Sequence, residues 1–197
     1  MTSTKNRGFT LIEISIVLAI SFIAGGMFFM SLQPALKQSR VNNAYDETLM
    51  TLRRARDEAA AELRIYVVSF TLPGTITVTQ NTTTGPILVT TVLPADVSFD
   101  VEAGIPNTSL TTPDGFGTGK AAIDFDQGVG GGNTSTIYFY PDGTARDLNG
   151  NINNGVVYLA RPGDLYSSRA ITLWGTTGRL RGWRLYNNNG APYWRQQ

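Results

Sequence analysis

The chain has neither cysteine nor histidine among its 197 residues. Without cysteine it can form no disulfide and no thiolate site, so the fold must rest on its packed core. Without histidine it lacks the commonest general base and the commonest transition-metal ligand. A Ser-His-Asp triad and a histidine zinc site are therefore excluded. We expect a non-enzymatic protein with no catalytic residue, no metal and no cofactor.

Charge is also missing from one long stretch near the N-terminus. No residue from 14 to 36 is charged, and Glu13 directly precedes this run. A membrane-spanning helix needs roughly 20 apolar residues, and residues 9–32 supply that length. A lone carboxylate in such a span is costly and by default marks function. Its own segment offers no positive charge, so we expect the partner of Glu13 to come from another molecule or from a terminus created by cutting the chain.

These residues resemble a known processing signal. The run Gly8-Phe9-Thr10-Leu11-Ile12-Glu13 is similar to the cleavage and methylation signal of type IV prepilins and type II secretion pseudopilins. The resemblance implies that prepilin peptidase cuts between Gly8 and Phe9 and that Phe9 becomes N-methylphenylalanine. It also implies an assembly role for Glu13, which would pair with the terminal amine of a neighbouring pilin. The alternative, an ordinary secretory signal peptide, fits poorly because the apolar run is long and contains a carboxylate.

The sequence predicts four segments. Residues 1–8 form a leader peptide, and residues 9–32 form a transmembrane or filament-core helix. An amphipathic helix over 33–64 then continues into a C-terminal antiparallel β domain over 65–197. The leader is basic, which predicts that it stays on the cytoplasmic side of a bacterial inner membrane. The β domain would then lie in the periplasm before the subunit enters a pilus or pseudopilus.

Apolar residues recur at steps of three or four beyond the apolar run, which is typical of a helix with one buried face. These residues are Val41, Tyr45, Leu49, Leu52, Ala55, Ala59 and Leu63. We therefore expect one long helix over about 9–64. Gly25, Gly26 and Pro34 lie inside it, and each is unfavourable in a helix interior. A kink or local unwinding over 25–34 and a helix rescued by its neighbours in the bilayer both remain open.

Residues beyond 64 favour strands separated by turns, because β-branched and aromatic runs alternate with Pro-Gly and Pro-Asp-Gly signals. The expected strands are 65–72, 75–80, 87–93, 97–102, 121–126, 136–140, 155–160, 169–174 and 179–186. Residues 103–120 and 127–135 are rich in Gly, Thr and Asn and are expected to be loops. The fold class is therefore α+β, with a type IV pilin-like long N-terminal helix packed against an antiparallel sheet domain.

Three further motifs resemble the GspH/FimT family of pseudopilins. Residues 52–59 are similar to its Leu-x-x-Ala-Arg-x-Glu-Ala run, residues 138–143 to its Phe-x-Pro-x-Gly hairpin, and residues 177–181 to its closing Thr-Gly-Arg strand. Residues 75–135 match the family poorly. The resemblance implies a minor pilin or pseudopilin, present in few copies, that initiates a type IV pilus or a type II secretion pseudopilus or lies at its tip.

The C-terminal tail is the one basic patch in the sequence. Residues 165–197 contain five arginines and no acid, whereas residues 65–147 contain eight acids and two bases. Four of these arginines, Arg179, Arg181, Arg184 and Arg195, lie close to aromatic residues, which suits phosphate contacts and base stacking. The run 178–181 also resembles the Gly-Arg-x-Arg motif of DNA-binding FimT-type pilins. DNA binding is thus an alternative function, and an edge strand protected by arginines is the structural alternative.

Two other patterns are interpreted as structural. Residues 147–153 space four oxygen-bearing side chains two apart, but Ile152 replaces the glycine of a calcium loop and Tyr158 replaces its final glutamate. We expect a hairpin loop there. The three tryptophans, Trp174, Trp183 and Trp194, are expected in the core or at an interface.

Overall fold

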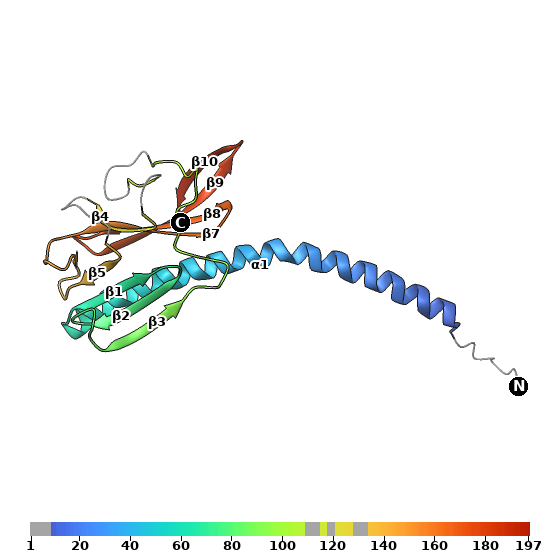
Figure 1. Cartoon of the computed structure of the whole chain (residues 1–197), viewed down its shortest axis with the longest axis horizontal. Helices are drawn as coiled ribbons and strands as arrows, with labels where there is room; N and C mark the ends of the chain where they lie inside the picture. Colours follow the sequence, from blue (N-terminus) through green and yellow to red (C-terminus); the bar gives the residue numbers. More distant parts are fainter. Residues whose placement is uncertain (1–8, 109–114, 118–120, 128–133) are drawn as a thin grey trace, which may run out of the picture. The chain divides into compact units, whose positions relative to one another are not determined.

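The computed structural model describes residues 9–108, 115–117, 121–127 and 134–197 (Figure 1). The chain divides into two compact units, Met1–Ser39 and Arg40–Gln197. The expected leader, with Gly8, lies outside the described residues, as do Pro113 and Asp114 of one expected turn. A long N-terminal helix and antiparallel sheets make up the fold. The expected α+β, type IV pilin-like fold class is therefore confirmed.

Helix α1 spans Leu11–Glu62, within two residues of the expected bounds at each end. It continues without a break through Gly25, Gly26 and Pro34, so of the alternatives left open for this stretch, local unwinding is excluded. The helix ends at Glu62 and is followed by Leu63, whose φ of 53° lies in the left-handed region. The N–H of Arg64 then donates to the carbonyl of Ala59 at 3.2 Å, which closes the last turn.

The second unit contains two five-stranded antiparallel sheets (Figure 1). The first has the order β3-β2-β1-β5-β6, and the second has the order β10-β9-β8-β7-β4. In the first sheet the strands are β1 Tyr66–Thr71, β2 Thr75–Gln80, β3 Ile87–Val92, β5 Thr136–Phe139 and β6 Ala145–Arg146. In the second sheet they are β4 Ile123–Gln127, β7 Asn154–Arg161, β8 Asp164–Trp174, β9 Arg179–Asn188 and β10 Ala191–Gln196.

Eight of these strands overlap an expected strand, and the others differ from the expectation. Strands β6 and β10 were not expected, and β8 begins five residues before the expected 169. Residues 97–102 were expected as a strand but form only one isolated bridge, between Ser98 and Ala160. That segment alternates in polarity like a strand, but after this bridge it continues as a covering segment over the second sheet, where Val101 and Ile105 pack.

The expected apolar stripe of α1 is confirmed over most of its length. Six of its residues are buried in the main core, namely Val41, Tyr45, Leu49, Leu52, Ala55 and Ala59. The last one, Leu63, is 76% exposed, so its assignment to the stripe is wrong. The main core also contains residues from both sheets, such as Ile76 of β2 and Ile171 of β8. The C-terminal half of α1 is thus held by both sheets at once.

A second, smaller core lies on the other side of the second sheet. Alternate residues of β7, β8 and β9 (Val156, Tyr158, Ala170, Trp183 and Leu185) pack there against Ile105 and Phe116 of the long segment between β3 and β4. Since successive side chains of a strand point to opposite faces, the second sheet is buried on both faces. This is why β7 is apolar at nearly every position from 156 to 160.

Candidate functional site

Glu13 sits in the first turn of α1, where its carboxylate accepts hydrogen bonds from Thr10. Both the backbone N–H and the hydroxyl of Thr10 donate to Glu13 Oε2 at 2.8 Å. In return the N–H of Glu13 donates to the Thr10 hydroxyl at 3.3 Å. This reciprocal pattern is a capping box, in which a Thr at the N-cap and a Glu three residues later satisfy free backbone donors. The sequence interpretation missed it, although Thr-x-x-Glu is a recognised signature.

The capping box changes the expectation for Glu13. We expected that its partner had to come from outside its own segment, but Thr10 supplies hydrogen bonds from within it. Thr10 is neutral, however, so the carboxylate keeps its negative charge. A local cap lowers the cost of holding Glu13 in a membrane, and a positively charged partner would still lower it further.

The first unit presents apolar side chains with nothing packed on them in the described chain. Phe9 is 86% exposed, and the side chains of Leu11, Ile20 and Phe29 are similarly uncovered. The most apolar 18-residue window of α1 has a mean hydropathy of 2.2, so α1 is long and apolar enough to cross a membrane by length and composition.

Polar side chains in this apolar stretch bond within the helix. The hydroxyls of Ser15 and Ser21 donate to the carbonyls of Leu11 and Val17 at 2.9 and 2.8 Å. These serines therefore need no external partner, as suits a helix in lipid.

The four arginines expected to bind DNA do not lie on one surface. Arg181 is opposite Thr172 and Arg179 is opposite Trp174, so both stand on the face of the second sheet that carries the smaller core. Arg184 is opposite Arg195 and therefore stands with it on the other face, the one that α1 packs against. The pleat of β9 therefore divides the four residues into two pairs on opposite faces of the sheet.

The pair Arg184 and Arg195 lies among tyrosines at the β9–β10 hairpin. The guanidinium of Arg184 lies 5.1 Å from the centre of the Tyr186 ring, and that of Arg195 lies 6.0 Å from it. The Tyr186 and Tyr193 rings are 5.9 Å apart. On the other face, Arg179 lies 4.8 Å from the Trp174 ring. Each pair thus combines positive charge with an aromatic surface.

Arg169 is the strongest electrostatic feature that the sequence interpretation missed. It lies on β8, opposite Arg184 of β9, and is 0% exposed. Its Nη1 donates to the backbone carbonyls of Ser167 and Ser168 at 2.9 and 3.0 Å, and its Nη2 donates to Asn42 Oδ1 of α1 at 2.9 Å. Burial, and then the nearby charge of Arg184, lower its pKa to about 10. Arg169 therefore ties the helix to the second sheet.

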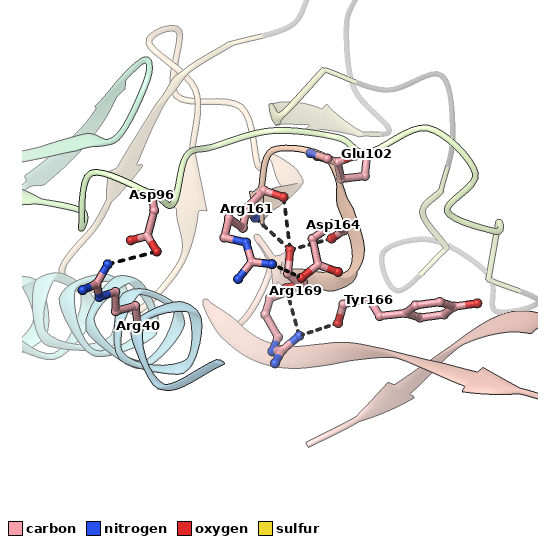
Figure 2. A network of polar contacts seen from close by, with 9 residues as sticks. Arg40, Asp96, Glu102, Arg161, Asp164, Tyr166 and Arg169 are labelled. Atoms are coloured by element: carbon pink, nitrogen blue, oxygen red, sulfur yellow. Dashed lines mark hydrogen bonds and ion pairs between the residues drawn. The ribbon is translucent and has the colours of Figure 1, made fainter. Parts of the chain in front are cut away.

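Figure 2 shows the polar contacts around Arg169. Arg40 of α1 pairs with Asp96 at 3.3 Å, and Arg161 pairs with Asp164 at 2.7 Å across the β7–β8 turn. Glu102 accepts the N–H of Gly163 at 2.8 Å, which fastens the covering segment to the same turn. These contacts position the helix, the segment after β3 and the β7–β8 hairpin relative to one another, so we assign them a structural role.

Two of the three tryptophans, Trp183 and Trp194, lie in the core as expected, whereas Trp174 is 36% exposed. Trp183 is buried and its Nε1 donates to Thr172 at 3.0 Å, while the Nε1 of Trp194 donates to the Pro106 carbonyl at 2.9 Å. Both rings contact Phe116: the ring centroids of Trp183 and Trp194 lie 5.4 and 5.1 Å, respectively, from the centroid of Phe116. They serve the smaller core.

The loop at residues 147–153 is closed by hydrogen bonds from its backbone to the side chain of Asp147. One carboxylate oxygen of Asp147 accepts the N–H groups of Asn149 and Asn151 at 2.8 Å each. This agrees with the expected hairpin loop, since aspartate stabilises turns by bonding backbone N–H groups a few residues on.

A groove of about 600 Å³ lies between α1 and the edge of the first sheet. Its apolar surface comes from Met50, Val78 and Val89, and its rim carries the ionisable residues Asp46, Glu47, Arg54 and Glu58. Arg54 Nε and Glu58 Oε1 are 2.6 Å apart, so these two charges compensate each other. The remaining rim charge is negative. The sequence interpretation missed this groove because it is formed by residues that are distant in the sequence.

Residues 3–29 match the family described as the prokaryotic N-terminal methylation motif. No curated protein and no solved structure matches the chain. The matched segment includes the expected cleavage step, Glu13 and the apolar part of α1. The chain therefore carries a type IV prepilin-like signal ahead of a type IV pilin-like fold. These features fit a precursor that prepilin peptidase processes, that is anchored in a membrane and that assembles with other pilins.

Proposed function

We propose that the protein is a minor pilin or pseudopilin of the GspH/FimT type, cut between Gly8 and Phe9 and methylated on Phe9. The match of residues 3–29 to the methylation motif carries the proposal. The uncovered apolar face of the helix that follows supports it. The subunit would be stored in the inner membrane with its β domain in the periplasm, and would then initiate or cap a type IV pilus or a type II secretion pseudopilus.

The helix supplies the means of assembly. In lipid, apolar helices gain nothing from the hydrophobic effect by associating, but a helix withdrawn from lipid must bury its apolar face against other helices. Glu13 then sets the register, because one stagger brings it to the amine of a neighbouring subunit. Leaving one partner of such a buried pair unmatched costs about 3–5 kcal/mol. Before assembly the Thr10 cap would hold the carboxylate, and assembly would add the amine to it.

Mass spectrometry of the protein purified from a strain with prepilin peptidase tests the processing. The expected product begins at Phe9 and carries one additional methyl group. A product that keeps residues 1–8 would refute the proposal.

Assembly can be tested with Glu13→Ala and, as a matched control, Ser15→Ala. Both variants should reach the membrane, because neither change adds charge to the apolar span. Glu13→Ala should be recovered poorly with sheared filaments, whereas Ser15→Ala should be recovered normally because the Ser15 hydroxyl bonds within its own helix. Normal recovery of Glu13→Ala would refute the assigned role.

DNA binding by a tip subunit is the second candidate function. The observation that favours it is the cluster of Arg184 and Arg195 with Tyr186 and Tyr193 at the β9–β10 hairpin. Because the arginines are divided between two faces, two double variants separate the contributions. Detergent-solubilised Arg184→Ala/Arg195→Ala protein should bind single-stranded DNA more weakly. The slope of the logarithm of the binding constant against the logarithm of the salt concentration should become less steep by about 0.7 per lost phosphate contact. The Arg179→Ala/Arg181→Ala protein tests the other face. This function would be excluded if DNA binding did not depend on salt concentration and neither double variant changed it.

A further inference from the structure

The edge of the first sheet is open at β3. Strand β3 is the last strand in the order, and its sequence, Ile-Leu-Val-Thr-Thr-Val, contains no charge and no proline. The side chains of Ile87 and Val92 are 67% and 68% exposed. Natural sheets usually protect such an edge with charges, prolines or a covering segment. Pro86 directly precedes β3, but within the described strand no charge or proline blocks the edge and its outer side chains are exposed, so the edge is available for association.

The groove beside β3 defines the chemistry of the partner. Val89 and Thr91 of β3 line it together with Met50 of α1, whose side chain is 68% exposed. With Arg54 paired to Glu58, Asp46 and Glu47 leave the rim negative. An occupant should therefore bring apolar or aromatic surface for the floor and positive charge for the rim.

The β9–β10 hairpin of the same chain has this chemistry. Tyr186 and Tyr193 provide aromatic surface, and Arg184 and Arg195 provide positive charge on the same face of the hairpin. Strand β10 is the edge strand of the second sheet. Figure 1 shows β3 and β10 on opposite sides of the second unit, so the hairpin cannot reach the groove of its own copy.

We propose that the acidic groove between α1 and β3 binds the basic, aromatic β9–β10 hairpin of a second copy of this chain. The two surfaces differ, so the contact is heterologous: each copy offers a groove to one neighbour and a hairpin to another. Repetition of such a contact gives an open chain of subunits rather than a closed dimer. The inference rests on the proposed filament function and adds to it the periplasmic contact that would accompany the helix packing. It also gives the four hairpin residues a protein partner in place of DNA.

The absence of cysteine allows a direct test by cross-linking full-length protein in cells. One tagged copy carries Asn43→Cys at the groove, and a second copy with a different tag carries Ala191→Cys on the hairpin, on the face of Tyr193 and Arg195. A short bis-maleimide should yield a dimer that contains both tags. A copy with Asp57→Cys, on α1 but outside the groove lining, replaces Asn43→Cys as the control and should give at least about tenfold less dimer.

Charge exchange tests the stated chemistry. Glu47→Arg in the first copy or Arg195→Glu in the second should each lower the dimer yield about tenfold, and the two changes together should restore it. Failure of the combined change to restore the dimer, or loss of the dimer after nuclease treatment, would overturn the inference.

Processing separates this inference from the proposed function. If mature, methylated protein is recovered with filaments yet gives no two-tag dimer, the groove contact is wrong and the filament function stands. If residues 1–8 are still attached, the filament function fails and the inference fails with it.

Discussion

The contact between Tyr45 of α1 and Gly182 of β9 gives a sharp test of how the helix is held on the second sheet. A Cβ atom at position 182 would lie 2.6 Å from Tyr45 Cζ and 3.2 Å from Cε2, and it would overlap the hydroxyl oxygen. Tyr45 is 5% exposed and belongs to the main core, so its ring is surrounded by other core side chains. The Gly182→Ala change therefore forces the Tyr45 ring, the helix or the strand to shift.

The size of the effect follows from two opposing terms. Overpacking a filled core costs about 1–3 kcal/mol, whereas replacing a strand glycine by alanine contributes about 0.5–1 kcal/mol in favour of folding. The difference between these terms is a net loss of up to about 2.5 kcal/mol in the free energy of unfolding, with a central value near 1 kcal/mol. For a folded unit of this size, the central value corresponds to a fall in Tm of about 2–4 °C.

Thermal unfolding of the detergent-solubilised chain measures this loss, with the fluorescence of the adjacent, buried Trp183 as a local reporter. The matched comparison is Gly182→Ala in a Tyr45→Leu background, where the ring is absent and the alanine should cost less than about 0.5 kcal/mol. An equal cost in both backgrounds would show that the clash with Tyr45 is not the cause. A Tm raised by Gly182→Ala in the parent background would refute the close approach itself.

Three further predictions concern single residues. Leu63→Gly should raise the free energy of unfolding by about 1 kcal/mol, because this exposed leucine holds a left-handed φ that glycine adopts without strain; an unchanged or lower stability by thermal unfolding would contradict this. Asn42→Ala should cost about 1.5–3 kcal/mol in chemical denaturation, since it removes the acceptor of a buried guanidinium, whereas the exposed neighbour Asn43→Ala should change stability by less than about 0.5 kcal/mol. Burial and the hydrogen bond to Glu62 raise the pKa of Tyr66 to about 12. The stability that the neutral Tyr66 hydroxyl contributes is therefore fully present below about pH 10 and is lost between about pH 10 and 12. The Tyr66→Phe change should remove this part of the pH dependence of the free energy of unfolding.

The helix and most strands were predictable because their signals are local. The stripe from Val41 to Ala59 has helical period, and the β-branched runs between turn signals mark most of the strands. Strand β10 carried a signal that the sequence interpretation did not use. Asn189 and Gly190 have φ of 51° and 90°, as a two-residue hairpin turn requires. Pro192 and the mixed polarity of β10 are not typical of a strand, so β10 was not predicted.

The parts of the site that sequence could not give depend on contacts between distant residues. Arg169 is tied to Asn42, 127 positions earlier, and no spacing in the sequence links the two. The division of the four arginines into two pairs follows from the register of β8, β9 and β10, which fixes the face of each residue. Likewise, the groove joins the middle of α1 to β3. A cluster of like residues in sequence is therefore a poor guide to a surface when it falls on a strand.

The N-terminal carboxylate shows how a local rule and an assembly requirement can share the same residues. If the subunit is stored in a membrane as proposed, the charge of Glu13 needs hydrogen-bond donors there, and the Thr10–Glu13 capping box provides a backbone N–H and a hydroxyl. These donors are neutral, so the carboxylate retains its negative charge and its attraction for an amine. If Glu13 sets the register of assembly, the cap must be strong enough to allow storage and weak enough to yield. Thr10→Val tests this balance: it removes the hydroxyl donor and keeps the side-chain volume, so membrane levels of the subunit should fall while the Glu13-dependent register persists. Equal membrane levels of Thr10→Val and the parent protein, measured by quantitative blotting, would mean that the cap has no role in storage.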